Sequence, residues 1–313
     1  NLYSEGKYSE VLALINDLLS QFPYSVDLHN IAGASNAGLR KFDDSINNYK
    51  QAIKINPDFA DAHNNIGNAF LGKGELDNAI TSYKKASLVK PDYTEAYLNM
   101  GNALMDKGMI GEAIDSYKEA IKTNPDLAIA YYLIANAFLQ KDELDEAIAN
   151  YKKATLIFPD YTEAYLNMGN ALMGKGMLDE AIDNFKEVIK INPDYADAFN
   201  NMGNAFQVKG DLESAIDYYY QAVKLKPDFA EAFNNLGSAL RGRLELNDSI
   251  DNFKQAIKLK PYYVDAYCNM GDALFVSGRY EEAIESCKQA IRIDPNYSEA
   301  YYNMGNALME KGD

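Results

Sequence analysis

Apolar and small residues recur at spacings of three and four in two short stretches of residues 94–127. The first stretch carries Ala96, Tyr97, Met100, Gly101, Ala103 and Leu104. The second stretch carries Ile110, Ala113, Ile114, Tyr117, Ala120 and Ile121. Such spacing places these side chains on one side of an α-helix. Gly108 favours a left-handed end to the first helix, and Pro125 pushes the residue before it out of the second. We therefore predict two helices of about 12 to 14 residues, which need neighbours for stability.

This helix pair recurs every 34 residues along the chain. The period is followed by all nine prolines, Pro23, Pro57, Pro91, Pro125, Pro159, Pro193, Pro227, Pro261 and Pro295. If position 1 lies 31 residues before each proline, the complete repeats are 26–59, 60–93, 94–127, 128–161, 162–195, 196–229, 230–263 and 264–297, with partial repeats at 1–25 and 298–313. A fixed period of this size predicts one all-α solenoid array over 1–313, in which each repeat packs against its neighbours.

Small residues share fixed register positions where helices are expected to cross. Position 8 holds Gly33, Gly67, Gly101, Gly169, Gly203, Gly237, Gly271 and Gly305. Small side chains allow helix backbones to approach closely, so we expect tight crossings here. Position 4 is aromatic in most repeats and holds His29 and His63 in two of them. We interpret both histidines as substitutes for a core aromatic residue.

The pattern AYLNMGNALMDKG…EAIDSYKEAI…P resembles the tetratricopeptide repeat, and the resemblance covers essentially the whole chain. It implies a right-handed α-α superhelix whose concave surface, lined mainly by first helices, holds peptides or extended segments of partner proteins. Three residues depart from the pattern: Ala135 replaces the position-8 glycine, and Asp142 and Leu244 replace loop glycines. We expect these changes to alter local geometry and to leave the fold intact.

Asparagines recur on the first helices at positions that core packing does not explain. Position 6 holds what we name the asparagine row, Asn65, Asn99, Asn167, Asn201, Asn235, Asn269 and Asn303. Position 9 holds Asn68, Asn102, Asn136, Asn170, Asn204 and Asn306, with Ser238 and Asp272 as exceptions. Asparagine is a poor residue for a helix interior, because its amide competes for backbone hydrogen bonds.

Two roles fit these amides. They could pair with the backbone of an extended peptide, since each carboxamide offers a donor and an acceptor, or they could brace neighbouring repeats. We favour peptide contact for position 6 and bracing for position 9. The asparagine row is also similar to that of the O-linked N-acetylglucosamine transferase family, which implies a grip on peptide backbone. The row is interrupted at Leu133, where the same repeat carries Ile129 in place of an acid.

Position 2 is acidic in eight first helices. This acidic row consists of Asp27, Asp61, Glu95, Glu163, Asp197, Glu231, Asp265 and Glu299. One interpretation is a negative surface that selects partners bearing Lys or Arg. The other is helix capping, because pairs such as Asp58 and Asp61 have the spacing of a capping box. We favour capping, and the two roles are compatible.

Charge and composition narrow the classes of function. The 313 residues carry a formal net charge of −16, which disfavours nucleic acid and favours basic partners. Cys268 and Cys287 form neither a disulfide framework nor a metal-binding pattern, and a local bridge between them is only a minor alternative. No apolar run is long enough to span a membrane. With both histidines in one core slot, we predict no catalytic residue, cofactor or metal.

The sequence therefore predicts a non-catalytic scaffold that binds a protein or peptide, with the asparagine row and Asp61, Glu95, Glu163, Asp197, Glu231 and Asp265 as binding residues. The alternative is the substrate-recruiting region of a larger enzyme, such as a glycosyltransferase. Self-association through the terminal half-repeats is a further alternative. The chain opens at Asn1 in the middle of a repeat, so we interpret it as a fragment, and few cysteines favour a cytoplasmic location without fixing it.

Overall fold

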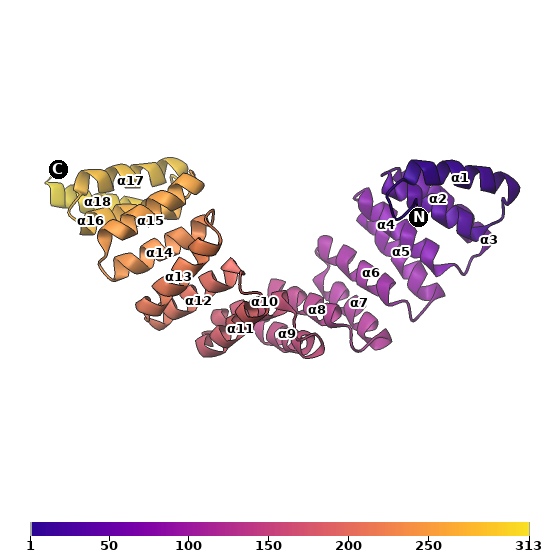
Figure 1. The fold of residues 1–313 in the computed structure, drawn as a ribbon, viewed down its shortest axis with the longest axis horizontal. Helices are drawn as coiled ribbons and strands as arrows, with labels where there is room; N and C mark the ends of the chain where they lie inside the picture. The colour runs from indigo at the N-terminus through magenta and orange to yellow at the C-terminus, as the bar shows by residue number, and fades with distance from the viewer. Residues whose placement is uncertain (1, 313) are drawn as a thin grey trace. The chain divides into compact units, whose positions relative to one another are not determined.

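The structure is a computed structural model that describes residues 2–312 as α-helices joined by short turns, with no strand in that range (Figure 1). The helices are α1 Tyr8–Gln21, α2 Val26–Gly38, α3 Phe42–Ile55, α4 Ala60–Gly72, α5 Leu76–Val89, α6 Thr94–Asp106, α7 Ile110–Thr123, α8 Ala128–Gln140, α9 Leu144–Ile157, α10 Thr162–Gly174, α11 Leu178–Ile191, α12 Ala196–Lys209, α13 Leu212–Leu225, α14 Ala230–Gly242, α15 Leu246–Leu259, α16 Val264–Val276, α17 Tyr280–Ile293 and α18 Ser298–Lys311. Even numbers are first helices of the repeats and odd numbers are second helices. The predicted all-α helix pairs are therefore confirmed.

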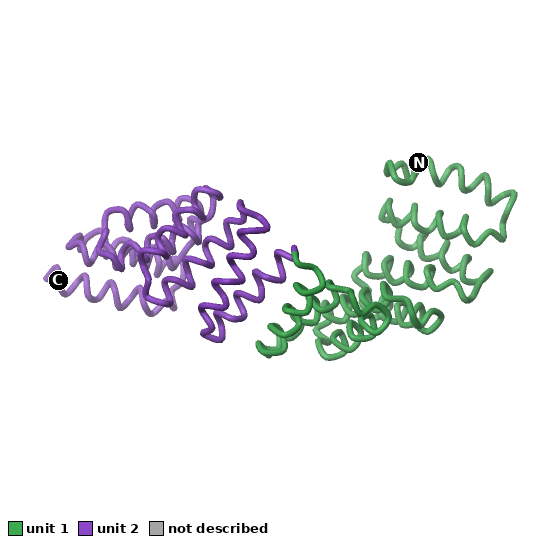
Figure 2. Tube along the Cα trace, turned by 60° about the horizontal axis from the view of Figure 1, so that its bottom comes forward, with its two compact units in different colours: residues 1–159 green, residues 160–313 purple. Residues whose placement is uncertain are grey.

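Two compact units divide the chain, Asn1–Pro159 with α1 to α9 and Asp160–Asp313 with α10 to α18 (Figure 2). Within each unit a first helix packs against its own second helix, and that second helix packs against the next first helix. Neighbouring first helices also touch, as α2 and α4 do in one unit and α12 and α14 in the other. Each unit is thus a stack of helix pairs, as expected for a solenoid.

Helix ends follow the residues that the sequence singled out. Asn56, the residue before Pro57, is extended with φ −128° and ends α3. Gly108 has φ +79°, in the left-handed region that glycine enters without steric cost. Arg40, Asp142 and Leu244 adopt the same region with φ between 58° and 64°, so these side chains are tolerated at some cost.

Six of the position-8 glycines make room for an aromatic ring on the second helix of the same repeat, and Gly271 makes room for Cys287 Sγ. A Cβ atom built on Gly101 would lie 2.3 Å from Tyr117 Cε1, and one on Gly67 would lie 2.4 Å from Tyr83 Cε1. Both tyrosine side chains are buried almost completely. The close approach predicted from the sequence is therefore that of a ring lying against bare helix backbone. Gly305, on the terminal α18, has no such neighbour within 4 Å.

Candidate binding face on the first helices

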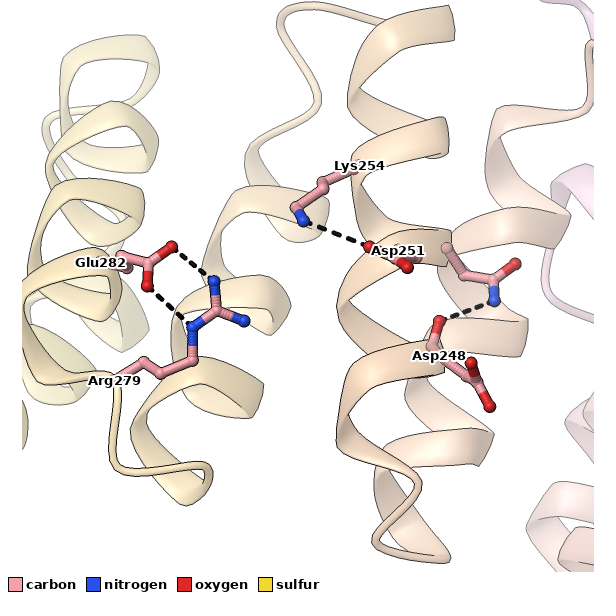
Figure 3. A network of polar contacts seen from close by, with 6 residues as sticks. Asp248, Asp251, Lys254, Arg279 and Glu282 are labelled. Carbon is pink, nitrogen blue, oxygen red and sulfur yellow. Dashed lines mark hydrogen bonds and ion pairs between the residues drawn. The ribbon is translucent and has the colours of Figure 1, made fainter.

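The exposed sides of the second helices carry charges that pair within their own helix (Figure 3). Lys254 lies 3.2 Å from Asp251 on α15, and Arg279, at the start of α17, lies 2.6 Å from Glu282. Similar pairs one turn apart occur on α7 and α11. Exposed pairs of this kind contribute little to stability. Because these charged side chains are already paired within the second helices, the candidate binding residues are those of the first helices.

The asparagine row lies half-buried on the first helices, and six of its members bond to the preceding repeat. Asn99 donates from Nδ2 to Asn64 Oδ1 at 3.1 Å and to Asn68 Oδ1 at 3.5 Å. Asn235 makes the equivalent pair of bonds to Asn200 at 3.0 Å and Asn204 at 3.2 Å. Single bonds to the preceding repeat are made by Asn65, Asn201, Asn269 and Asn303. The amide nitrogens of the row thus brace the stack.

The position-9 asparagines are held by tyrosines of their own repeat. Tyr83 donates to Asn68 Oδ1 at 2.7 Å, and the same bond, at 2.5 to 2.8 Å, joins the pairs Tyr117 and Asn102, Tyr151 and Asn136, and Tyr219 and Asn204. Repeat 162–195 has Phe185 in place of the tyrosine, and there Asn170 Oδ1 accepts from Asn201 at 2.9 Å. A brace between neighbouring repeats, as predicted for position 9, is found at Asn68, Asn170 and Asn204, whose Oδ1 atoms accept from the asparagine row of the next repeat.

A third set of asparagines, at position 5, was not recognised as functional from the sequence. Asn64 is only 1% exposed and Asn200 and Asn234 are 7% exposed, and all three accept from the asparagine row of the next repeat. The sequence does contain a signal for these residues, because asparagine recurs at position 5, next to the asparagine row at position 6. What the sequence did not reveal is that these oxygens face the following repeat.

Once these bonds are formed, the two polar rows expose complementary atoms. The Nδ2 groups of Asn65, Asn99 and Asn235 are engaged, and their Oδ1 atoms accept no hydrogen bond from the residues that the structure describes. In Asn68 and Asn204 the roles of the two atoms are exchanged. Their Oδ1 atoms accept hydrogen bonds, and their Nδ2 groups donate to no residue that the structure describes. These five asparagines therefore offer free acceptors at position 6 and free donors at position 9, whereas Asn201 Oδ1 accepts from Asn200 Nδ2 at 3.5 Å.

The acidic row is exposed at Asp61, Glu95, Glu163, Glu231 and Asp265 and half-buried at Asp197. The preferred capping interpretation is wrong. The N-cap of α4 is Phe59 without a side-chain cap, and Asp58 lies in the preceding turn, where its N–H donates to Asn56 Oδ1 at 3.1 Å. Asp61 therefore sits in the first helical turn, where the helix dipole favours negative charge without a capping bond.

Several carboxylates of the acidic row contact polar groups of a neighbouring element. Glu95 accepts from Asn64 Nδ2 at 3.3 Å, and Glu231 lies 3.2 Å from Lys260 Nζ. Asp265 accepts from the Tyr297 hydroxyl at 2.7 Å, and this bond raises the pKa of Tyr297, because it favours the protonated phenol. The row thus combines structural bonds with negative charge on an exposed surface.

In the first unit, α8 interrupts both rows, as expected from the sequence. Ile129 is 38% exposed at the acidic position, and Leu133 packs beside the buried Ile114 and Tyr117 in place of an asparagine. Positions 2 and 6 of this segment are therefore apolar.

The two histidines are half-buried and the two cysteines are buried. His29 is half-buried and pairs through Nε2 with the Pro23 carbonyl oxygen at 3.0 Å, and burial lowers the pKa of His63. Both are less buried than the core position predicted for them, and so are position-4 aromatic residues such as Tyr97 and Phe199, because position 4 is itself only half-buried. Cys268 and Cys287 are buried free thiols. Within residues 2–312, no group of three or more potential ligands could hold a metal ion, and no helix is long and apolar enough to cross a membrane.

Family models match along most of the chain. A model described as TPR repeat matches residues 40–74, 67–108, 101–142, 135–176, 169–209, 245–276 and 271–312, and one described as Tetratricopeptide repeat matches 196–229. A search of curated proteins gave no match.

Solved structures also resemble the chain. YrrB, described as a TPR protein with an unusual peptide-binding site, is 28% identical with a TM-score of 0.52 and covers 59% of this chain and 95% of its own. MamA is 31% identical with a TM-score of 0.50, covering 53% of this chain and 97% of its own. A chain of the Cut9-Hcn1 hetero-tetramer of APC/C is 21% identical with a TM-score of 0.58. The match covers 93% of this chain and 58% of that chain, and it supports the fold alone.

Proposed function

The chain belongs to the tetratricopeptide repeat family, a family of protein-interaction scaffolds, and from this premise we propose that it binds an extended peptide segment along its first helices without catalysing a reaction. The observation that supports the proposal most strongly is the arrangement of free amide atoms. Oδ1 atoms at position 6 offer acceptors, and Nδ2 atoms at position 9 offer donors. An extended backbone presents both N–H and C=O groups along its length, so this arrangement can pair with peptides of many sequences.

The amides are also held in place before a partner binds. Asn204 Oδ1 accepts from Tyr219 and Asn235, so its free Nδ2 has a defined orientation. A group that is already ordered loses less conformational entropy on binding than a mobile side chain. The bracing bonds and peptide contact are therefore compatible roles of the same residues.

The acidic row suggests which peptides are preferred. Its exposed carboxylates lie on the same first helices as the amides, and the whole chain carries a net charge of −16. We propose that Lys or Arg in the bound segment contributes to selection and to the rate of association. The likeness to YrrB, whose description names a peptide-binding site, supports the same class of ligand.

The non-catalytic part of the proposal is supported by the state of the thiols. Burial raises the pKa of Cys268 to about 12 and that of Cys287 to about 11. A thiol acts as a nucleophile in its ionised form, so neither cysteine is activated near neutral pH.

The test uses an array of random peptides and compares an Asn99→Ala/Asn235→Ala variant with an Asn184→Ala/Asn252→Ala control. The control removes two amides from second helices, where each donates to a carbonyl of its own helix at 2.8 Å. We expect at least about tenfold weaker peptide binding for the first variant and unchanged binding for the control. Unchanged affinity in both folded variants would refute the amide mechanism. Capture of basic peptides that weakens with salt would support selection by the acidic row.

A further inference from the structure

The first complete repeat contains a hollow on the side of the asparagine row. It has a volume of about 320 Å³ and lies between α2, α3, α4 and Tyr3 of the segment that precedes α1. Its lining includes Ala34 and Ala37 from α2, Phe42 and Tyr49 from α3, and Asn65 and Asn68 from α4. This size is near the lower end of the range of ligand pockets, about 300–1,000 Å³, and suits one large side chain.

The hollow exists because two register positions carry unusually small residues. Positions 9 and 12 hold Ala34 and Ala37 here, whereas the next repeat holds Asn68 and Leu71. Tyr49 does not fill the space, because its ring lies against the backbone at Gly33 and is only 3% exposed. Methyl groups and aromatic rings thus line one part of the hollow, and polar atoms, including those of Asn65 and Asn68, line much of the rest.

Two amide atoms at this hollow have no partner among the described residues. Asn65 donates from Nδ2 to Asn30 at 3.3 Å, which leaves its Oδ1 as an acceptor. Asn68 Oδ1 accepts from Tyr83 at 2.7 Å and from Asn99 at 3.5 Å, which leaves its Nδ2 as a donor. A recess in which methyl groups and aromatic rings lie beside one acceptor and one donor matches a single peptide residue, whose side chain is apolar and whose backbone carries the complementary groups.

We infer that this hollow is a specificity pocket for one apolar side chain, of the size of Leu, Met or Phe, in an extended peptide whose backbone pairs with Asn65 and Asn68. The inference rests on the proposed function and adds to it the residue type that the peptide must carry. Asp27 and Asp61 are exposed on α2 and α4, so the preferred segment has basic residues near its apolar residue. The partner is therefore a peptide with an apolar residue flanked by Lys or Arg.

The pocket can be filled by substituting a side chain that other repeats of this chain carry at the same register position. Ala37→Met places methionine at position 12, which Met105 and Met173 occupy in other repeats. The matched control is Leu139→Met, at position 12 of α8 and outside the lining of the hollow. Ala34→Asn is a second filling variant, because it places at position 9 the asparagine found there in neighbouring repeats. Circular dichroism melting curves would verify that all three variants fold.

A random dodecapeptide library displayed on phage would be selected in parallel on the wild-type chain and the three variants. We expect wild type and Leu139→Met to enrich apolar residues at one peptide position by about tenfold over the naive library, the preference gained by burying one such side chain. Ala37→Met and Ala34→Asn should lose this preference and still select basic peptides. A wild-type pool without an apolar position, or filled variants that keep it, would overturn the pocket while leaving peptide binding intact. A pool that enriches nothing on any of the four proteins would overturn peptide binding itself.

Discussion

The hydroxyl of Tyr219 on α13 donates to Asn204 Oδ1 on α12 at 2.7 Å, and this bond connects the core of a repeat to its candidate binding face. The tyrosine ring is buried against the backbone at Gly203, while the asparagine amide lies half-buried on the first helix. Packing of the helix pair therefore sets the orientation of an amide on that face. The same pairing occurs in three repeats of the first unit, between Tyr83, Tyr117 and Tyr151 and their position-9 asparagines.

Removing this hydroxyl should loosen α12 and α13 locally. In Tyr219→Phe the ring stays in place, but Asn204 Oδ1 keeps only the bond from Asn235. We expect a loss of about 1 kcal/mol, seen as roughly fivefold faster amide hydrogen exchange in these two helices. Phe185→Tyr is the reverse substitution at the same register position and should not accelerate exchange in α10 and α11. Equal exchange rates in wild type and Tyr219→Phe would show that the bond contributes nothing.

The close approach of Gly101 to Tyr117 predicts a large effect from one methyl group. In Gly101→Ala the new Cβ would lie 2.3 Å from the ring, so ring or helix must move at a cost of about 1–3 kcal/mol, which exceeds or offsets the gain of about 1 kcal/mol from the higher helix propensity of alanine. Gly305→Ala is the control, because its Cβ would meet nothing within 4 Å, and alanine favours a helix over glycine by about 1 kcal/mol. We expect a lower thermal midpoint by circular dichroism for the first variant and an equal or higher one for the second. Similar shifts in both would contradict the role given to the ring.

The helices were predictable because their determinants are local. Apolar spacing, a loop glycine and a residue before proline each act within a few residues, and α3 ends at Asn56 before Pro57 as these rules predict. The sequence also identified positions 6 and 9 as unusual, because asparagine conflicts with helix propensity wherever it stands.

Atom pairing between repeats was not predictable in the same way. Asn99 and Asn64 are 35 residues apart, so their bond depends on how one repeat stacks upon the next. The capping prediction failed for a local reason: the turn after Pro57 uses Asp58, and the helix begins later with Phe59 at its N-cap. The hollow at Ala34 and Ala37 is marked in the sequence by two small residues, but its volume depends on where Phe42 and Tyr49 pack.

Leu244 should be a site at which glycine stabilises the protein. Its φ of +64° is costly for a residue with a Cβ atom, and its side chain is 70% exposed, so little packing offsets the cost. We expect Leu244→Gly to raise the free energy of unfolding by up to about 1 kcal/mol, after the greater entropy of glycine in the unfolded chain is subtracted. Gly210→Leu, at the same register position with φ +82°, should destabilise by a similar or larger amount. Urea unfolding followed by circular dichroism would measure both, and a destabilised Leu244→Gly would contradict the strain argument.

The buried thiols predict that the protein loses stability in alkali. Both are protonated in the folded and the unfolded chain below the ordinary thiol pKa of 9.0, so stability there is independent of them. Above that value the unfolded chain releases protons that the folded chain retains, because burial raises the pKa of Cys268 to about 12 and of Cys287 to about 11. The free energy of unfolding should therefore fall as pH rises, by about 1 kcal/mol per thiol near pH 10.

A Cys268→Ala/Cys287→Ala variant separates this effect from that of the buried tyrosines, of which Tyr49 has its pKa raised by burial to about 12. The variant should be less stable than wild type near pH 7.5, because it leaves small cavities, but should lose less stability between pH 7.5 and pH 10. Urea midpoints at the two pH values would give the difference. An identical alkaline loss in both proteins would mean that the thiols ionise equally in the folded and unfolded chains. In that case the thiols would also be open to alkylation in the folded protein, which reaction with iodoacetamide at pH 8.5 would detect independently.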